Sequence, residues 1–142
     1  MDEKDKIENP AILKFATELL DDVQVSIMNI RDKAMLVSTI RTKWVMMMFK
    51  EREMVKKLSN ARKKLLETGV VNLQTTDTAN RTISKMRLEE MVIASDPKIK
   101  KIDRMIVEQQ EVIQFIEYAM NIVSDFNFTV KHALDAIKLE QS

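Results

Sequence analysis

The 142-residue sequence has no cysteine, one glycine and two prolines, and only 5% of its residues are aromatic. Without cysteine the chain can form no disulfide and has no thiolate to act as a nucleophile or metal ligand. So few glycines and prolines leave few turns, and so few aromatics leave little strand-forming material. Methionine, leucine, isoleucine, alanine, lysine and glutamate are abundant, which favours helix. We therefore expect an all-α fold.

The residues that catalysis usually needs are also scarce. The single histidine, His132, has no carboxylate or second histidine at metal-ligand spacing, and no glycine-rich phosphate loop occurs. Acidic pairs such as Glu89 and Glu90 are adjacent on a predicted helix and point in different directions. We expect no enzymatic activity, no metal and no cofactor.

Long hydrophobic runs are absent too. The longest candidate, "WVMMMF" at residues 44–49, is six residues long, far short of a membrane span. The N-terminal "MDEKDKIENP" is polar and charged, unlike a secretory signal. Together with the lack of cysteine, this indicates a cytoplasmic protein with no membrane partner.

The N-terminal half, residues 1–67, is predicted to be helical. Asn9-Pro10 is typical of a helix start, and neither glycine nor proline follows before Gly69. This span is too long for an ordinary helix, so the sequence predicts either a hairpin with a turn near residues 29–33 or one long helix supported by partners. Gly69 is expected to end the helix. Residues 68–84, rich in threonine, asparagine and aspartate, are expected to form a flexible loop.

The C-terminal half, residues 85–142, carries the clearest pattern. A short helix is predicted at 85–93, and Ser95-Asp96-Pro97 signals a second helix start. From residue 99 to 137, positions three and four apart alternate over more than five heptads, and ten of these twelve seam positions are apolar. The other two are Gln109 and Asn127, which would fix the register of packing.

Two interpretations of this seam remain open. The helix packs on the N-terminal half of its own chain, or it also packs against copies of itself. Isoleucine at both kinds of seam position favours assemblies larger than a dimer, so a homo-oligomer is the preferred prediction. The candidate oligomerisation residues are Ile102, Ile106, Ile113, Ile116, Met120, Val123, Val130, Leu134 and Ile137.

Residues 50–64 concentrate positive charge in a chain whose net charge is only +1. Seven cations face two acids there, giving a local charge of +5: Lys50, Arg52, Lys56, Lys57, Arg62, Lys63 and Lys64. On a helix, six of the seven fall into two parallel columns, and Arg62 falls outside both. Such columns suit the phosphate backbone of a nucleic acid, because each neutralised phosphate releases counterions.

Other interpretations of the basic segment are a solvated helix face and a membrane-surface or calmodulin-target helix. Sequence-specific readout is not expected, because no helix-turn-helix, zinc-finger or RNA-recognition pattern occurs. Trp44 and Phe49 are candidates for stacking on bases. Trp44 lies on the apolar stripe of its helix, which favours core packing for that residue.

Three stretches of the chain carry landmarks of a known family. They are Asp96, Ile102-Asp103 and Lys131-His132 within residues 96–132, "IRTKW" at residues 40–44, and "NARKKLLETG" at residues 60–69. The first set has the same spacing as in the UvsY-like recombination mediators of T-even-type bacteriophages. The second stretch resembles that family's Ser-Lys-Trp, and the third resembles its basic segment running into a glycine. The resemblance covers roughly residues 30 to 137, and nothing is carried over to the residues before it.

The resemblance implies a non-enzymatic, ring-forming helical protein, and we expect a hexamer or heptamer. Its implied partners are single-stranded DNA, a RecA-like recombinase and single-strand-binding protein, in the cytoplasm of a phage-infected host. The implied activity is loading of the recombinase onto DNA coated by single-strand-binding protein, for recombination, recombination-dependent replication and repair. The family's DNA contacts map best onto Arg62, Lys63 and Lys64, and next onto Lys56 and Lys57.

One departure from the family concerns base stacking. An aromatic pair precedes the glycine in the family prototype, whereas this chain has Leu65 and Leu66 in that region. Phosphate contact is therefore the better-founded expectation. The alternative function is a structural coiled-coil scaffold or phage assembly protein without DNA binding, and a third is a transcription regulator, which would prefer a particular duplex sequence.

Overall fold

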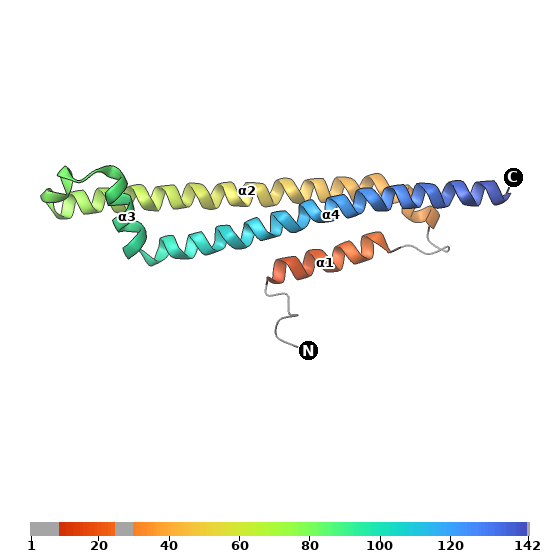
Figure 1. The fold of residues 1–142 in the computed structure, drawn as a ribbon, viewed down its shortest axis with the longest axis horizontal. Coiled ribbons are helices and arrows are strands. Elements are labelled where there is room, and N and C mark those ends of the chain that lie inside the picture. The colour runs from red at the N-terminus through yellow and green to blue at the C-terminus, as the bar shows by residue number, and fades with distance from the viewer. Residues whose placement is uncertain (1–8, 25–29, 142) are drawn as a thin grey trace, which may run out of the picture. The chain divides into compact units, whose positions relative to one another are not determined.

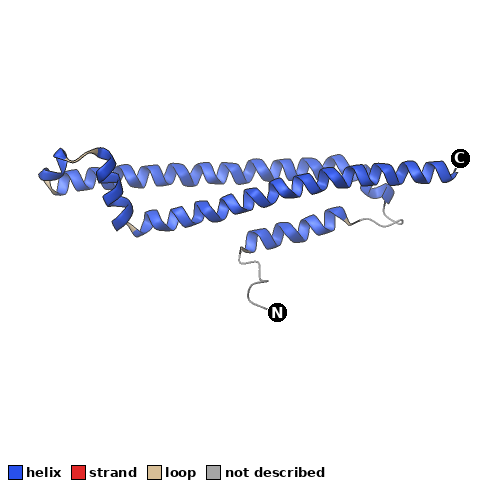
Figure 2. Cartoon of the chain, in the orientation of Figure 1, coloured by secondary structure: helices blue, strands red, loops and turns tan. Residues whose placement is uncertain are grey.

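The computed structural model describes residues 9–24 and 30–141. These residues form four α-helices joined by short connections (Figures 1 and 2): α1 Pro10–Val23, α2 Ile30–Thr76, α3 Lys85–Ser95 and α4 Pro97–Gln141, with a 3-10 helix, η2, at Thr78–Thr82. No strand occurs within the described ranges, so the predicted all-α fold is confirmed. None of the described helices is long and apolar enough to cross a membrane.

Local capping chemistry explains where the helices begin. The Asn9 side chain accepts a hydrogen bond from the Ala11 amide at 3.1 Å, with Pro10 in the first helical turn. Asp96 does the same for α4, accepting from the Lys98 amide at 2.9 Å. Ser84 caps α3 through the Arg87 amide at 3.4 Å. The predicted starts at Asn9-Pro10 and Asp96-Pro97 are confirmed.

The long N-terminal helical region is divided between two helices. Because α1 ends at Val23 and α2 begins at Ile30, the alternative of one continuous helix is wrong. The turn predicted near residues 29–33 was placed too late, since Ile30 and the residues after it already belong to α2. Residues 25–29 lie outside the described part of the chain.

Gly69 does not end α2. The helix continues to Thr76, so the loop predicted over 68–84 is too long at its N-terminal side. A Cβ atom at position 69 would lie 2.5 Å from Val92 Cγ1, so glycine is needed here for the close approach of α3 rather than for a turn. Val70, directly after it, is 8% exposed, and its burial helps to hold this part of the helix in place.

The chain divides into two compact units that differ from the predicted halves. Unit 1 comprises Met1–Glu51 and Glu111–Ser142, and unit 2 comprises Arg52–Gln110. Each unit therefore takes one stretch of α2 and one of α4. In each, the two antiparallel stretches lie side by side (Figure 1). The functional roles predicted for the two halves remain predictions.

Unit 1 is built around three helices. α1, α2 and α4 contribute Leu19, Trp44 and Ile116, and the last two are fully buried at 0% exposure. The Phe15 ring lies 6.3 Å from the Trp44 ring, centroid to centroid, in a tilted arrangement. A second cluster joins Ile30 of α2 to Phe126 and Val130 of α4.

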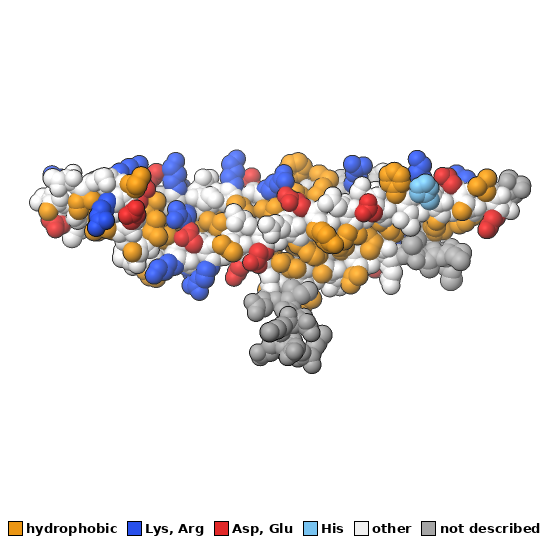
Figure 3. All heavy atoms as spheres, viewed as in Figure 1, with side chains coloured by type: hydrophobic (Ala, Val, Ile, Leu, Met, Phe, Trp, Pro, Cys, Tyr) orange, Lys and Arg blue, Asp and Glu red, His pale blue; other side chains and the backbone are white. Residues whose placement is uncertain are grey.

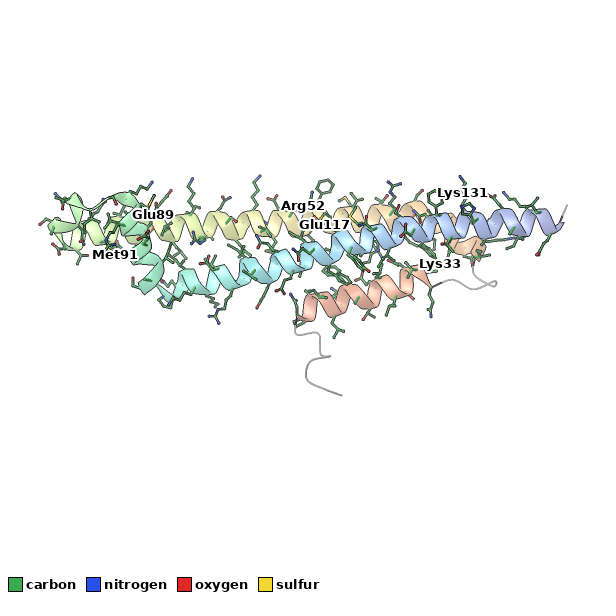
Figure 4. All side chains as sticks on the ribbon, in the orientation of Figure 1. Lys33, Arg52, Glu89, Met91, Glu117 and Lys131 are labelled. Carbon is green, nitrogen blue, oxygen red and sulfur yellow. The ribbon has the colours of Figure 1, made fainter. Side chains whose placement is uncertain are left out.

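Polar contacts hold α1 against α2 within unit 1. Asp22 is 8% exposed and accepts a hydrogen bond from Trp44 Nε1 at 2.8 Å, while Lys43 forms an ion pair with the same carboxylate. Lys33, labelled in Figure 4, donates to the Asp21 carbonyl at 2.9 Å near the end of α1. The buried carboxylate is thus both paired and hydrogen-bonded, as a buried charge requires.

Unit 2 has a smaller, aliphatic core. α3 crosses from the end of α2 to the start of α4 and buries Leu88 and Val92 against Val70 and Ile99. Leu65, Leu66 and Leu73 of α2 pack around this cluster. On the outer side of α3, Lys85 forms an i,i+4 ion pair with Glu89 at 4.0 Å, and Glu89 is labelled in Figure 4.

Candidate nucleic-acid interface

The seven cations predicted to bind nucleic acid all lie on α2, and we call them the basic strip. Six of them are exposed: Lys50, Arg52, Lys56, Lys57, Lys63 and Lys64. Arg62 is half-buried. Lys50 belongs to unit 1 and the other six to unit 2, which begins at Arg52. Arg52 is labelled in Figure 4.

Four lysines form the regular part of the basic strip. Lys57 and Lys64 are seven residues apart on one line along α2, and Lys56 and Lys63 form a second line beside it. Seven residues correspond to about 10.5 Å along a helix. These four lysines form no ion pair with any described residue. Their ammonium groups are therefore available to an external anion.

Arg62 has a different position from the rest of the basic strip. Its Nε donates to Asp103 Oδ1 of α4 at 2.6 Å, with the two side chains 30% and 42% exposed. The guanidinium is thus directed across unit 2 towards α4. Its place outside both columns in the sequence pattern was the sign of this role.

The charge of the chain is divided unevenly between the two units. Unit 2 contains 13 lysines and arginines against 8 aspartates and glutamates, a net charge of +5. Unit 1 contains 10 against 14, a net charge of −4. The chain's net charge of +1 therefore conceals a basic unit and an acidic unit.

The basic strip does not account for all of the positive charge in unit 2. Four further cations lie within seven residues at the start of α4: Lys98, Lys100, Lys101 and Arg104, and all four are exposed. In the sequence, the heptad pattern of the seam begins in the same stretch, and these cations were not predicted as a site. The signal was present in the letters "KIKKIDR".

The heptad seam of α4 packs inside the chain. Ile116, Val123 and Val130 are at most 2% exposed in unit 1. The remaining candidate oligomerisation residues are half-buried: Ile102, Ile106, Ile113, Met120, Leu134 and Ile137. The apolar stripe thus faces its own chain, as the first interpretation of the seam expected. The assignment of these residues to self-association stays a prediction.

The two candidate stacking residues are in opposite environments. Trp44 has 0% exposure and packs in the core of unit 1, so it presents no face to a base. Phe49, five residues later on the same helix, is 61% exposed. Core packing is therefore confirmed as the role of Trp44.

The described part of unit 1 has hollows on its surface, including two of about 410 and 370 Å³. The cavity that Trp44, Arg41 and Asn121 help to line in unit 1 holds about 200 Å³. No group of three or more potential metal ligands occurs within residues 9–24 and 30–141. The exposed cations of α2 and α4 are thus the chief chemical feature of the surface.

Comparison with known proteins adds a family and a fold. A family model described as "Recombination, repair and ssDNA binding protein UvsY" matches residues 18–142. No curated protein sequence gives a significant match.

Two crystal structures of the recombination mediator protein UvsY of bacteriophage T4 have a similar fold. One, in lattice type IV, has a TM-score of 0.71 at 16% identity, covering 91% of this chain and 98% of the other. The second, in lattice type II, has a TM-score of 0.70 at 15% identity, covering 92% and 97%.

Proposed function

The chain belongs to the UvsY family of recombination, repair and single-stranded-DNA-binding proteins, and we propose that it acts as a recombination mediator. In this role it binds single-stranded DNA and promotes loading of a RecA-like recombinase onto DNA coated by single-strand-binding protein. The observation that carries the proposal is the set of exposed lysines on α2 that have no ion-pair partner among the described residues.

The DNA contact we propose is electrostatic and independent of sequence. Lysine ammoniums that neutralise phosphates release condensed counterions, which favours binding most at low salt. Two lines of lysines, with a repeat of about 10.5 Å along each, can follow a backbone whose charges recur along a line. Lys56, Lys57, Lys63 and Lys64 are the central contacts, with Lys50 and Arg52 at one end.

The mediator mechanism we propose needs binding energy and geometry but no catalysis by this chain. DNA held in an extended path on the protein is gripped less well by single-strand-binding protein and is presented to the recombinase. ATP hydrolysis belongs to the recombinase. The setting is the cytoplasm of an infected host cell.

We further propose that the protein works as a homo-oligomer, a hexamer or heptamer arranged as a ring. Each copy contributes one basic strip, so weak sites combine through avidity. Within the seam, only the half-buried side chains such as Ile113 and Leu134 retain surface for another copy. The fully buried seam residues Ile116, Val123 and Val130 contribute to the assembly only indirectly, by holding α4 in position within its own chain.

The test is a titration of labelled single-stranded and duplex DNA of unrelated sequences at several salt concentrations. The wild type should bind single strands in preference, with a log–log salt slope of about −0.7 per phosphate contacted. The triple variant Lys57→Glu, Lys63→Glu, Lys64→Glu should bind far more weakly and show a shallower slope. Its oligomer size, measured by light scattering, should not change.

A matched control places the same charge reversal in unit 1. Lys14, Lys131 and Lys138 are exposed lysines there, and Lys131 is labelled in Figure 4. Their triple change to glutamate should cost much less affinity than the change in the basic strip. If the wild type binds no DNA at low salt, the mediator proposal fails and a structural coiled-coil scaffold becomes the better account. Recombinase loading onto coated DNA is the assay that follows a positive result.

A further inference from the structure

The start of α4 carries positive charge that the proposed function does not use. Lys98, Lys100, Lys101 and Arg104 are exposed and form no ion pair with any described residue. Asp103 is the one acid within residues 98–104, and Arg62 of α2 neutralises it at 2.6 Å. The positive charge of the four cations is therefore not neutralised by an acid of the same stretch.

Three of these cations point away from the core of unit 2. Ile99, Ile102 and Ile106 mark the inner face of this stretch, since all are buried or half-buried. At about 100° per residue, Lys100, Lys101 and Arg104 fall within a sector of about 100° on the opposite side of the helix. Lys98 lies about 60° outside that sector, towards the inner face.

The first turn of α4 places cations where helix electrostatics opposes them. The first turn of α4 contains no acid, and Lys98 lies in it. The helix macrodipole favours negative charge at this end and disfavours lysine. The amide of Lys98 is already satisfied by Asp96. Helix stability therefore does not account for the lysines of this first turn, whereas an anionic partner would offset the unfavourable dipole.

Unit 2 thus has a cationic face on each of its two long helices. The ion pair between Arg62 and Asp103 joins α2 to α4 at the level where both faces lie. Figure 3 shows lysine and arginine side chains along both long edges of this part of the molecule. Phosphates can therefore be contacted on both sides of the α2–α4 pair.

We propose that Lys100, Lys101 and Arg104, flanked by Lys98, form a second phosphate-binding surface for single-stranded DNA. This inference rests on the proposed function and extends it, because the DNA-binding footprint of each subunit then includes α4 as well as α2. The ligand chemistry is the phosphate backbone, so the surface has no preference among bases. Arg104 adds a planar fork of donors that suits phosphate oxygens.

The experiment neutralises the second surface with the triple variant Lys100→Gln, Lys101→Gln, Arg104→Gln. Its matched control is Lys131→Gln, Lys138→Gln, Arg31→Gln, which also removes two lysines and one arginine, here from exposed positions in unit 1. Binding of both to labelled oligo(dT) is measured over a salt series, with circular dichroism and light scattering to confirm fold and assembly. Loss of three phosphate contacts should reduce the magnitude of the log–log slope by about 2. The control should keep the wild-type slope.

The outcomes separate this inference from the proposed function. A wild type that binds no oligo(dT) overturns both. If the wild type binds and the basic-strip variant loses binding, but the α4 variant has the same slope and affinity as its control, only the second surface is wrong. An α4 variant indistinguishable from its control is also the result expected if the α4 cations bind an acidic protein segment rather than DNA. A reduced salt slope in the α4 variant, with the wild-type slope kept in its matched control, supports the inference.

Discussion

Unit 1 and unit 2 share the same two long helices yet differ in core and in charge. Unit 1 buries a tryptophan and a phenylalanine among three helices and has a net charge of −4. Unit 2 closes its helices with the short α3, buries only aliphatic side chains and has a net charge of +5. The unit with the larger core has the net negative charge, and the unit with the smaller core has the net positive charge.

The inner and outer faces of α2 change differently along the helix. Along α2, the inner face keeps its apolar pattern throughout. The outer face carries only Arg31, Asp32 and Arg41 as exposed charges before residue 50 and becomes strongly basic from there on. Packing and the proposed DNA binding therefore depend on different side chains of the same helix. Substitutions in unit 1 should mainly alter stability, and substitutions on the outer faces of unit 2 should mainly alter binding.

The largest effect is expected from removing the centre of the unit 1 core. Trp44→Ala should lower the free energy of unfolding by about 3–5 kcal/mol, because a fully buried indole leaves a cavity. Urea unfolding followed by circular dichroism measures this. Where the variant is still folded, its DNA affinity should remain close to the wild type.

Phe49→Ala is the control for this prediction, because it also removes an aromatic side chain from α2. Phe49 is 61% exposed, so the expected change is within about 0.5 kcal/mol. Equal losses of stability in the two variants would show that the assigned burial of Trp44 is wrong.

A smaller effect is expected at the contact between α2 and α3 in unit 2. Gly69→Ala gains about 1 kcal/mol in helix propensity. Its new Cβ, however, would lie 2.5 Å from Val92 Cγ1, and overpacking of this kind costs about 1–3 kcal/mol. We expect a net loss of about 1 kcal/mol in urea unfolding.

A double-mutant cycle with Val92→Ala tests the cause of that loss. Removing the two methyl groups opposite position 69 should relieve the clash, so Val92→Ala should cost less in the Gly69→Ala background than alone. Strictly additive effects would mean that the two residues do not meet.

A smaller effect than at Gly69 is expected at the ion pair that joins α2 to α4 in unit 2. Arg62→Gln should cost less than about 1 kcal/mol, because both side chains are partly exposed to solvent. Its effect on DNA binding should also be small, since Asp103 already engages the guanidinium. Lys63→Gln, one residue away, should reduce the salt slope by about 0.7.

The comparison between Arg62→Gln and Lys63→Gln is made on the same labelled oligo(dT). A larger loss of affinity in Arg62→Gln than in Lys63→Gln would mean that Arg62 leaves Asp103 to contact DNA. In that case the family resemblance, which favours Arg62 as a contact, would outweigh the geometry.

The features predicted correctly from the sequence depend on short-range chemistry. Asn9-Pro10 and Asp96-Pro97 mark helix starts because a capping side chain and a proline act on amides one or two residues away. The seam of α4 was recognisable because its period reports which face is apolar. The period does not report what covers that face, so it could not distinguish the chain's own helices from a second copy.

Long-range packing accounts for the features that the sequence did not reveal. A glycine in the sequence can mark the end of a helix or a place where a neighbouring helix approaches closely. The position of Val92 in the fold shows that Gly69 has the second role. The sequence pattern placed Arg62 outside both columns of the basic strip, but it could not identify its partner Asp103, which is 41 residues away in the chain. The cations at the start of α4 were overlooked because they alternate with the isoleucines of the seam.

The complete burial of Trp44 also gives the protein a built-in optical reporter. It is the only tryptophan in the chain, and its indole is enclosed in unit 1 with a hydrogen bond to Asp22. Fluorescence emission should therefore follow the unfolding of unit 1 alone, whereas circular dichroism follows the helices of both units. If the two transitions do not coincide in urea, the units unfold separately. The same enclosure makes the indole a poor sensor of DNA, so binding is better followed with a dye on the oligonucleotide.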